Sequence, residues 1–219
     1  MNYFIDCGIN RGQSITSFRK YFFQNKKWNY IGYEPANKGL QNNSYQIIKM
    51  NQSIKENSRF FETFKVFDKA VGSISKRRLF WYFYGSGSTG NIIKVIKMFL
   101  NDLKNLNLKN ALRIFKFTIL DFEDIPKVLK ELKKKGCFIS LKLDIEGHEF
   151  EILESMISRN IFPNQLLIEY HSSKINYPIS KTKALHKYLF DKKIEIFLWS
   201  ADDIPPMRKL GRFLNTEDC

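Results

Sequence analysis

Short apolar runs alternate along the chain with longer stretches in which apolar residues recur every three or four positions. The runs that we predict as strands cover residues 3–5, 30–33, 46–50, 65–67, 78–84, 138–143, 165–170 and 195–199. The stretches with helical spacing are one that carries Ile15, Phe18, Phe22 and Phe23, and others at 125–135, 149–158 and 181–190. Strands that alternate with helices predict an α/β fold, in which a mostly parallel sheet is covered by helices on both faces.

The segment 76–116 departs from this alternation and is rich in basic and aromatic residues. The aromatic run 80–84 is followed by the Gly/Ser stretch 85–90, and then by apolar residues at helical spacing among lysines. One interpretation is a lid or substrate-facing insertion with the glycines as its hinge. The other is a hairpin, a loop and a surface helix whose apolar side is buried. Because no repeat or low-complexity linker separates this segment from the rest, we expect a single domain over residues 1–219.

The balance of charges bears on the partners of the chain. It carries 36 Lys and Arg against 22 Asp and Glu, a formal net charge of +14 at pH 7. This charge favours an anionic partner such as nucleic acid, an acidic sugar or a membrane surface, although lysine-rich solvated faces account for it equally well. The three cysteines have no paired spacing and predict neither a disulfide framework nor a zinc site. No signal peptide is recognisable, and no apolar run approaches the roughly 20 residues that cross a bilayer, so we expect a cytoplasmic location. The sequence specifies no oligomeric state.

The first predicted strand ends in a turn with the spacing Asp-x-Gly-x-x-x-Gly, from Asp6 to Gly12. Gly8 and Gly12 permit a tight turn before a helix, whose first backbone amides and positive dipole end would face an anionic group. The turn has neither the Gly-x-Gly-x-x-Gly pattern of dinucleotide-binding proteins nor the Gly-Lys-Ser/Thr of a P-loop. It therefore predicts a site for the carboxylate of a bound amino-acid moiety, or for a phosphate.

Glu34 ends the second predicted strand, 22 positions after Gly12. An acid at the tip of the neighbouring strand is placed to hold a ribose diol by paired hydrogen bonds. Together with the glycine turn, it favours a nucleoside ligand at the carboxyl ends of parallel strands. The Asp-x-Gly form of the turn favours S-adenosylmethionine over NAD.

A second group of acidic residues follows two later predicted strands. Asp144 and Glu146 come after the run 138–143, and Glu169 and His171 follow the next strand. If both strands belong to the parallel sheet, these side chains meet at the same edge as the glycine turn. Three interpretations are open: a carboxylate or the imidazole takes a proton from a substrate hydroxyl, the acids only favour a helix start, or the group holds a divalent metal. We rank proton transfer or acceptor positioning first and metal last, so no metal ligand is predicted.

Four further residues are assigned structural roles. Glu149 and Glu151 lie in the first turn of the predicted helix 149–158, where the dipole stabilises acids by about 0.3–1 kcal/mol each. His148 is expected at the surface or as a capping residue. His186 lies within a predicted helix and is expected to be structural.

Four motifs in this order resemble the FkbM family of methyltransferases. They are Phe-Ile-Asp-Cys-Gly-Ile-Asn-Arg-Gly from residue 4, Tyr-Glu-Pro from residue 33, Leu-Lys-Leu-Asp-Ile-Glu-Gly-His-Glu-Phe-Glu-Ile-Leu from residue 141 and Ile-Glu-Tyr-His from residue 168. The segments 69–72 and 118–121 are similar to family segments as well. The resemblance extends from residue 4 to about residue 199, and the order of the motifs makes it more specific than any one of them.

The resemblance implies a Rossmann-like sheet of seven strands, S-adenosylmethionine as methyl donor, and transfer to a hydroxyl of a sugar, a glycan or a related small molecule. It implies a donor site made of Asp6, Gly8, Asn10, Gly12, Glu34 and Asp144, with Asp68 on the adenine side. Asp144 would lie next to the methionine part and the reacting methyl group. The basic, aromatic-rich insertion is unlike a minimal member, so the family does not imply the acceptor.

The sulfonium methyl group is already activated, so catalysis should consist mostly of holding the acceptor oxygen in line behind it at about 3–3.5 Å. We expect His171 to act as the base, followed by Asp144 or Glu146. Two other functions stay open: an RNA methyltransferase that uses the basic segment 76–116, and a non-catalytic nucleoside-binding module. The intact Asp-x-Gly and Asp-x-Glu-Gly motifs count against the non-catalytic module.

Overall fold

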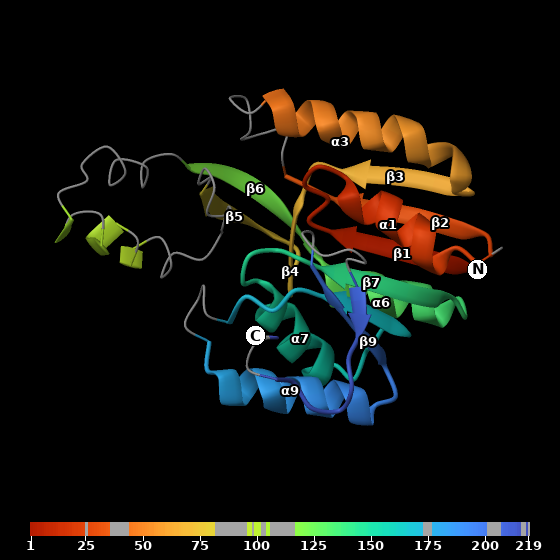
Figure 1. The fold of residues 1–219 in the computed structure, drawn as a ribbon. Coiled ribbons are helices and arrows are strands. Elements are labelled where there is room, and N and C mark those ends of the chain that lie inside the picture. Colours follow the sequence, from red (N-terminus) through yellow and green to blue (C-terminus); the bar gives the residue numbers. More distant parts are fainter. Residues whose placement is uncertain are drawn as a thin grey trace.

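The computed structural model describes residues 1–24, 26–35, 44–81, 96–97, 99–101, 104–105, 117–172, 177–200, 207–215 and 218. Their main elements are, in chain order, β1 (Asn2–Cys7), α1 (Gln13–Phe22), β2 (Trp28–Tyr33), α3 (Ser44–Asn57), η1 (Ser58–Phe60), β3 (Thr63–Phe67), β4 (Ala70–Gly72), β5 (Lys76–Trp81), β6 (Phe117–Asp124), α6 (Ile125–Lys134), β7 (Phe138–Leu143), α7 (Glu149–Ser158), β8 (Gln165–Ile168), α9 (Ile179–Asp191), β9 (Glu195–Trp199) and β10 (Met207–Lys209) (Figure 1). None of the helices in these residues is long and apolar enough to cross a membrane.

The main sheet, over the part of the chain described, has seven strands in the order β10-β9-β8-β7-β1-β2-β3. β10 runs antiparallel to β9, and the other neighbouring strands are parallel. The chain fills the sheet outward from β1 to β3 and then from β7 to β9, so the strand order reverses between β1 and β7. This confirms the expected Rossmann-like, mostly parallel sheet of seven strands, and it places the switch point of the fold between β1 and β7.

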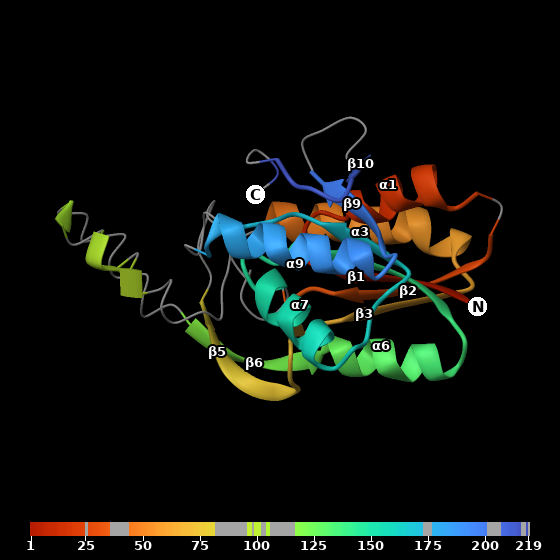
Figure 2. The same ribbon diagram turned by 90° about the horizontal axis from the view of Figure 1, so that it is seen from below.

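Helices cover both faces of this sheet (Figure 1 and Figure 2). α1 and α3 lie on one face, over an aromatic cluster that includes Phe4 and Phe18. α6, α7 and α9 lie on the other face, where Leu129 and Leu153 belong to a mostly aliphatic cluster. Successive residues of β1 serve both clusters, Phe4 the first and Ile5 the second. A parallel strand buried on both faces has this alternation, which explains the near-continuous apolar runs in the sequence.

A smaller sheet of three strands, in the order β4-β6-β5, accompanies the main sheet. β5 and β6 are antiparallel, with Trp81 opposite Phe117, and β4 runs parallel to β6. The Arg78 guanidinium of β5 donates to both carboxylate oxygens of Glu151 in α7, at 2.9 and 3.1 Å. This pair ties the smaller sheet to the main fold. The separate sheet was not expected from the sequence, because strand pairing across a long insertion leaves no local signal.

The expected strand at 46–50 is wrong, because these residues lie within α3. The prediction rested on a short apolar run, which periodicity alone does not assign to strand or helix. In the structure, Met50 and Asn57 are buried and Ile54 packs against the aromatic cluster. Positions 50, 54 and 57 have helical spacing, and this longer pattern decides the element.

The insertion 76–116 is described only in part. Residues 76–81 form β5, and residues 96–97, 99–101 and 104 are helical, which confirms the helical spacing for those positions. On the expected apolar side of this helix, Ile96 has an exposed fraction of 46% and Phe99 is half-buried, so the burial that the second interpretation expects is not found at Ile96 and is partial at Phe99. The aromatic residues 82–84 and the Gly/Ser stretch 85–90, on which the lid interpretation rests, lie outside the described residues.

Candidate active site

The loops that follow β1, β2, β7 and β8 meet at one edge of the main sheet. Cys7 at the end of β1 pairs with Tyr33 of β2 on one side and with Leu143 of β7 on the other, and Leu143 pairs with Ile168 of β8. Residues just beyond these strand ends are therefore neighbours. The expected convergence of the glycine turn, Glu34 and the later acidic residues is confirmed.

The turn after β1 has a backbone that favours glycine at two positions. Gly8 has a φ of +87° and Gly12 a φ of +84°, with Asn10 between them at +52°. A Cβ on Gly8 would lie 2.0 Å from the carbonyl oxygen of Asp144, and one on Gly12 would lie 2.5 Å from the side chain of Ser53. The two glycines thus let the turn approach the loop after β7 and helix α3 more closely than any side chain would permit.

Glu34 lies beside this turn and is bonded to it. Its Oε2 accepts a hydrogen bond from the backbone N–H of Asn10 at 2.8 Å. Burial raises the pKa of Glu34 to about 7, although the Asn10 N–H and Lys142 act in the opposite direction. The carboxylate is therefore poorly solvated near neutral pH, which makes its charged form unfavourable in free energy. A hydrogen bond donated by a ligand hydroxyl would offset this cost. Asp68 follows β3, the next strand outward from Glu34.

A buried lysine joins the two loops of the switch point. Lys142 of β7 has a side chain only 1% exposed, and its Nζ donates to the carbonyl oxygen of Gly8 at 2.6 Å. The same Nζ lies 3.2 Å from Oδ1 of Asp6 and 3.3 Å from Oδ2 of Asp144. Burial alone would lower the pKa of Lys142, but the two carboxylates outweigh it and raise the pKa, so the ammonium stays charged.

Asp6 is fully buried on the inner side of this lysine. Its Oδ2 accepts hydrogen bonds from the hydroxyl of Tyr30, at 2.9 Å, and from that of Ser14. With Oδ1 facing Lys142, its contacts lie within the protein and position the turn. Direct contact between Asp6 and a donor, which the family resemblance implies, stays a prediction.

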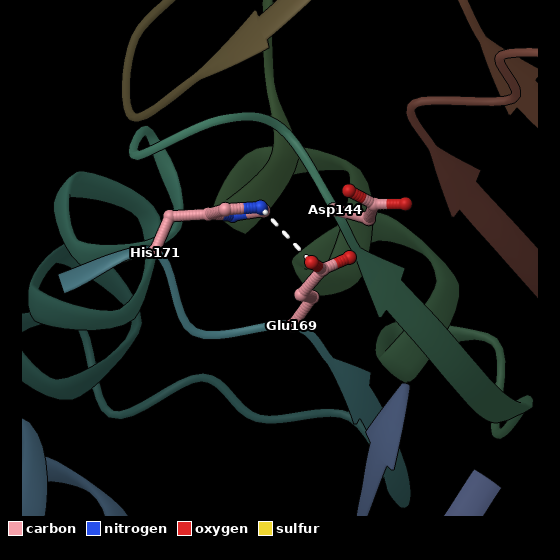
Figure 3. Close-up of side chains that lie close together, drawn as sticks. All are labelled: Asp144, Glu169 and His171. Carbon is pink, nitrogen blue, oxygen red and sulfur yellow. Dashed lines mark ion pairs between the residues drawn. The ribbon is translucent and has the colours of Figure 1, made fainter. Parts of the chain in front are cut away.

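His171 follows β8 and lies between two glutamates. Its Nδ1 is 2.8 Å from Oε1 of Glu149, and its Nε2 is 3.3 Å from Oε1 of Glu169 (Figure 3). Burial would lower the pKa of His171, but the hydrogen bonds to these carboxylates outweigh it and raise the pKa to about 10. With no cation bound, the ring is therefore an imidazolium at neutral pH and donates from both nitrogens. In that charge state it cannot accept a hydroxyl proton, which argues against its expected role as the base.

Glu149 orients this histidine from the start of α7. Its carboxylate is fully buried and accepts hydrogen bonds from the backbone N–H groups of Ile145, at 2.8 Å, and Gly147, at 2.7 Å. These bonds agree with the expected role at a helix start. The contact with His171 was not expected, and it gives the buried charge a third partner.

Glu146 lies in the middle of the turn between β7 and α7. Its φ of +58° is a left-handed conformation that is uncommon for residues other than glycine. Its charge contributes to the raised pKa of His171. Asp144, Glu146 and Glu169 are all half-buried at this edge. One atom each from Asp144, Glu169 and His171 lie within 4.8 Å of one another, an arrangement that is able to hold a metal ion.

The other two histidines have structural surroundings. His148, expected at the surface or as a capping residue, stands at the N-cap position of α7, although its side chain makes no capping hydrogen bond. It is 8% exposed, and its ring packs edge-on against Phe122 of β6. Its Nδ1 is 3.5 Å from Glu151, and the hydrogen bond to His148, followed by those to Arg78, holds the pKa of Glu151 well below its usual range. His186 is buried in α9 and bonded to the Gly211 carbonyl oxygen at 2.7 Å, in agreement with its expected structural place.

Lys142 is a residue of this edge that the sequence analysis did not single out, and Glu149 is one that it assigned only to a helix start. Lys142 is the one charged residue of β7, and a charge in a strand buried on both faces requires a buried partner. That position was a usable signal. Glu149 carried no comparable signal, because acids are common in the first turn of a helix.

This edge is acidic although the protein as a whole is basic. The carboxylates that gather here, facing Lys142 and His171, belong to Asp6, Glu34, Asp144, Glu146, Glu149 and Glu169. An excess of negative charge in a partly desolvated place attracts cationic groups, such as a sulfonium, an ammonium or a metal ion. The arrangement is therefore suited to a ligand that carries positive charge next to a hydroxyl-rich part.

Comparison with known proteins agrees with this geometry. A family model described as Methyltransferase FkbM domain matches residues 6–196. The matched region starts at Asp6 and ends within β9, so it contains all of the residues gathered at this edge. No curated protein and no solved structure matches the chain.

Proposed function

The chain belongs to the FkbM methyltransferase family, and from this premise we propose that it transfers the methyl group of S-adenosylmethionine to a hydroxyl of a sugar or a related glycan intermediate. The observation that carries the proposal is the switch point between β1 and β7, where the glycine turn, Glu34 and Asp144 lie together. Open parallel sheets bind their ligands at such a switch point, outside the carboxyl ends of the strands.

Each part of S-adenosylmethionine matches the chemistry of a residue or a set of backbone groups near this switch point. The backbone amides at the start of α1 suit the carboxylate of the methionine part. Glu34 suits the ribose diol, and Asp68, one strand further out, suits the adenine side. Asp144 lies in the loop after β7, next to the glycine turn, and is half-buried, so its charge suits the ammonium or the sulfonium.

In the proposed reaction the acceptor oxygen attacks the methyl carbon in line with the departing sulfur. The C–O bond forms as the S–CH₃ bond breaks, which leaves a methyl ether and S-adenosylhomocysteine, and the hydroxyl proton passes to a carboxylate of this edge. Glu146 is our choice for that carboxylate, because it is half-buried in the turn next to Asp144. His171 is the weaker choice because it already carries a proton at neutral pH.

Calorimetric titration with S-adenosylmethionine and S-adenosylhomocysteine tests the donor site. We expect saturable binding of both ligands, and about 10- to 100-fold weaker binding by Glu34→Gln, because the ribose hydroxyls lose a charged acceptor. The matched control is Glu131→Gln in α6, an exposed acid that pairs only with Lys134 among the residues described. This variant should bind both ligands as the unaltered protein does.

Transfer is then measured with a donor labelled in its methyl group and a panel of sugars and glycan intermediates. Glu146→Gln should lower the rate about 10²- to 10⁴-fold and leave donor affinity unchanged. Folded protein that binds neither ligand would contradict the proposed donor site. In that case a nucleoside-fold module without transferase activity becomes the better explanation.

A further inference from the structure

Asp144, Glu169 and His171 bring three metal-binding atoms together where two adjacent strands end. Asp144 follows β7, and the other two residues follow β8, which pairs with β7 in parallel. The three atoms lie within 4.8 Å of one another, and Figure 3 shows the side chains gathered between the strand ends. A cation about 2.0–2.2 Å from each ligand needs ligand atoms roughly 3–4 Å apart. The spacing in the structure is up to 4.8 Å, so a bound cation would draw the three atoms closer together.

Glu149 provides a second, independent observation. It is not one of the three, yet it is fully buried and lies 2.8 Å from Nδ1 of His171. Its own position is fixed by two backbone N–H groups of the turn before α7. With Nδ1 held in this way, the Nε2 atom faces Glu169. A carboxylate that orients the remote nitrogen of a histidine is the usual outer partner of a metal-binding imidazole.

The charge of the neighbourhood also favours a cation. Oxygens of Asp144 and Glu169 lie within 4.8 Å of each other, and the charge of Glu146 acts on the same histidine. Carboxylates that gather in a partly desolvated place repel one another. Lys142 faces Asp144, but it faces the buried Asp6 as well, so its single charge is shared. A divalent cation that binds Nε2 of His171 releases the proton held there to solvent and still adds one net positive charge to the cluster.

We propose that Asp144, Glu169 and Nε2 of His171 form a binding site for one divalent cation, with Glu149 as the residue that positions the imidazole. Two carboxylate oxygens and one imidazole nitrogen match Mn²⁺ best, because carboxylates suit Mg²⁺ and Mn²⁺ whereas imidazole suits the transition metals. Three protein ligands leave open positions for water and for one ligand oxygen.

The role of this cation rests on the proposed methyl transfer, whereas its binding does not. A hydroxyl bound at an open position would be held at the edge where the donor's methyl group is expected, and its proton would be lost more easily. Glu146 is not one of the three ligands and keeps its proposed role as the acceptor of that proton. The acceptor class that fits is a polyol or sugar whose hydroxyl oxygens can enter the cation's shell.

The competing arrangement is an ion pair alone. In that case His171 keeps a proton on Nε2 and bridges the two glutamates, and no cation enters. The two arrangements differ in whether the cluster binds Mn²⁺ and in whether its affinity depends on Glu149.

The test uses the full-length protein, stripped with EDTA and titrated with Mn²⁺ while free Mn²⁺ is followed by electron paramagnetic resonance. We expect one saturable site, with affinity lowered more than tenfold in His171→Gln and in Glu169→Gln. Glu149→Gln keeps all three ligands and should lower the affinity about 10- to 100-fold through orientation of the imidazole. Glu131→Gln is the matched acidic control and should bind Mn²⁺ normally. Circular dichroism melts accompany each variant, and the half-buried Glu169 gives a variant that is expected to fold.

Absence of saturable Mn²⁺ binding overturns the site, and so does binding that is unaffected by His171→Gln and Glu169→Gln. Titration with S-adenosylhomocysteine in the presence of EDTA separates this outcome from failure of the proposed function. Nucleoside binding without Mn²⁺ binding rejects the cation site and leaves the methyltransferase proposal standing. Mn²⁺ binding without nucleoside binding does the reverse.

Discussion

The two ends of the main sheet carry opposite charge. At the carboxyl ends of β1, β2, β7 and β8, carboxylates outnumber the two cations that face them. At the amino ends, five lysines line a hollow of about 540 Å³, namely Lys130, Lys133, Lys134, Lys192 and Lys193. The same topology explains both, because α6 and α9 end near this hollow and α7 begins at the acidic edge. Helix C-termini favour cations and N-termini favour anions.

This difference shows that the net charge of +14 does not describe the site. On composition alone, an anionic partner and ordinary lysine-rich faces exposed to solvent explain that charge equally well. The described lysines of the hollow lie at helix ends, far from the carboxyl ends of the strands, where the ligand is expected and the side chains are mostly acidic. The sign of a ligand is therefore better inferred from the groups that surround a strand end than from the whole chain.

The largest effect is expected from removing the cation of the acidic edge. Lys142→Met keeps much of the buried stem but leaves Asp6 and Asp144 without their counter-charge, which should lower the free energy of unfolding by about 3–5 kcal/mol. Lys133→Met at the other end removes a half-buried lysine bonded to Asn164, and should cost only about 0.5–1.5 kcal/mol. Urea unfolding of both variants measures the difference. Equal losses of unfolding free energy would mean that the buried lysine at the acidic edge stabilises the fold no more than the half-buried lysine at the other end.

A second comparison uses one glycine from each end. Gly8→Ala places a Cβ 2.0 Å from the Asp144 carbonyl oxygen at a φ of +87°, and we expect a loss of about 2–4 kcal/mol together with weaker donor binding. Gly136→Ala after α6 also has a positive φ, +68°, but its Cβ would meet nothing within 4 Å, so about 1 kcal/mol is expected. Thermal melts and donor titrations give both quantities. If the two variants lose the same free energy of unfolding, the close approach between Gly8 and Asp144 is not what requires a glycine at position 8.

The sequence alone predicted which residues meet at the acidic edge, but it did not predict how they are bonded to one another. The glycine turn, Glu34 and the acids after β7 and β8 were predicted to meet, because the carboxyl ends of parallel strands share one edge and the motifs record which residues stand there. The bonding within the cluster was not predicted. Whether a carboxylate faces solvent or a lysine depends on contacts between residues more than 100 positions apart, as between Gly8 and Lys142.

The errors in the fold have a similar origin. Residues 46–50 were assigned to a strand because a short apolar run has no distinctive period, and the decisive positions lie further along α3. The pairing of β5 with β6 spans a long insertion, so no local pattern indicates it. His148 was expected at the surface or as a capping residue, and it does occupy the N-cap position of α7. Its burial was not expected, because the contact with Phe122 comes from the smaller sheet.

A smaller effect is expected from the charge of Glu34. Its pKa of about 7 in the folded protein lies above the ordinary value of 4.5, so its protonated form stabilises the fold. That contribution is complete below about pH 4.5 and is lost as the pH rises through about 7. Glu34→Gln should therefore be more stable than the unaltered protein by about 1–3 kcal/mol at pH 8, and equally stable near pH 4.

Urea unfolding across this pH range measures the effect, with Glu131→Gln as a control that should show no such gain. A gain that is the same at pH 4 and pH 8 would show that the substitution acts through packing and not through the charge. Donor binding should also strengthen between pH 6 and pH 8 in the unaltered protein, because the ribose diol needs the ionised carboxylate. The variant should lack this pH dependence.

The smallest effect is expected from the lysines of the hollow, and it tests whether the two ends act separately. The doubly substituted variant Lys192→Gln, Lys193→Gln should bind the donor and Mn²⁺ within twofold of the unaltered protein at 150 mM salt. The six residues of β7 separate the ends by about 20 Å, whereas charges are screened within about 8 Å at this ionic strength. At 10 mM salt the screening length grows to about 30 Å, so removal of two positive charges should then slightly strengthen binding of the cationic ligands. If either dissociation constant changed by more than fivefold at 150 mM salt, the lysines would have to affect the acidic edge by something other than their electrostatic field. The two ends would then not act separately.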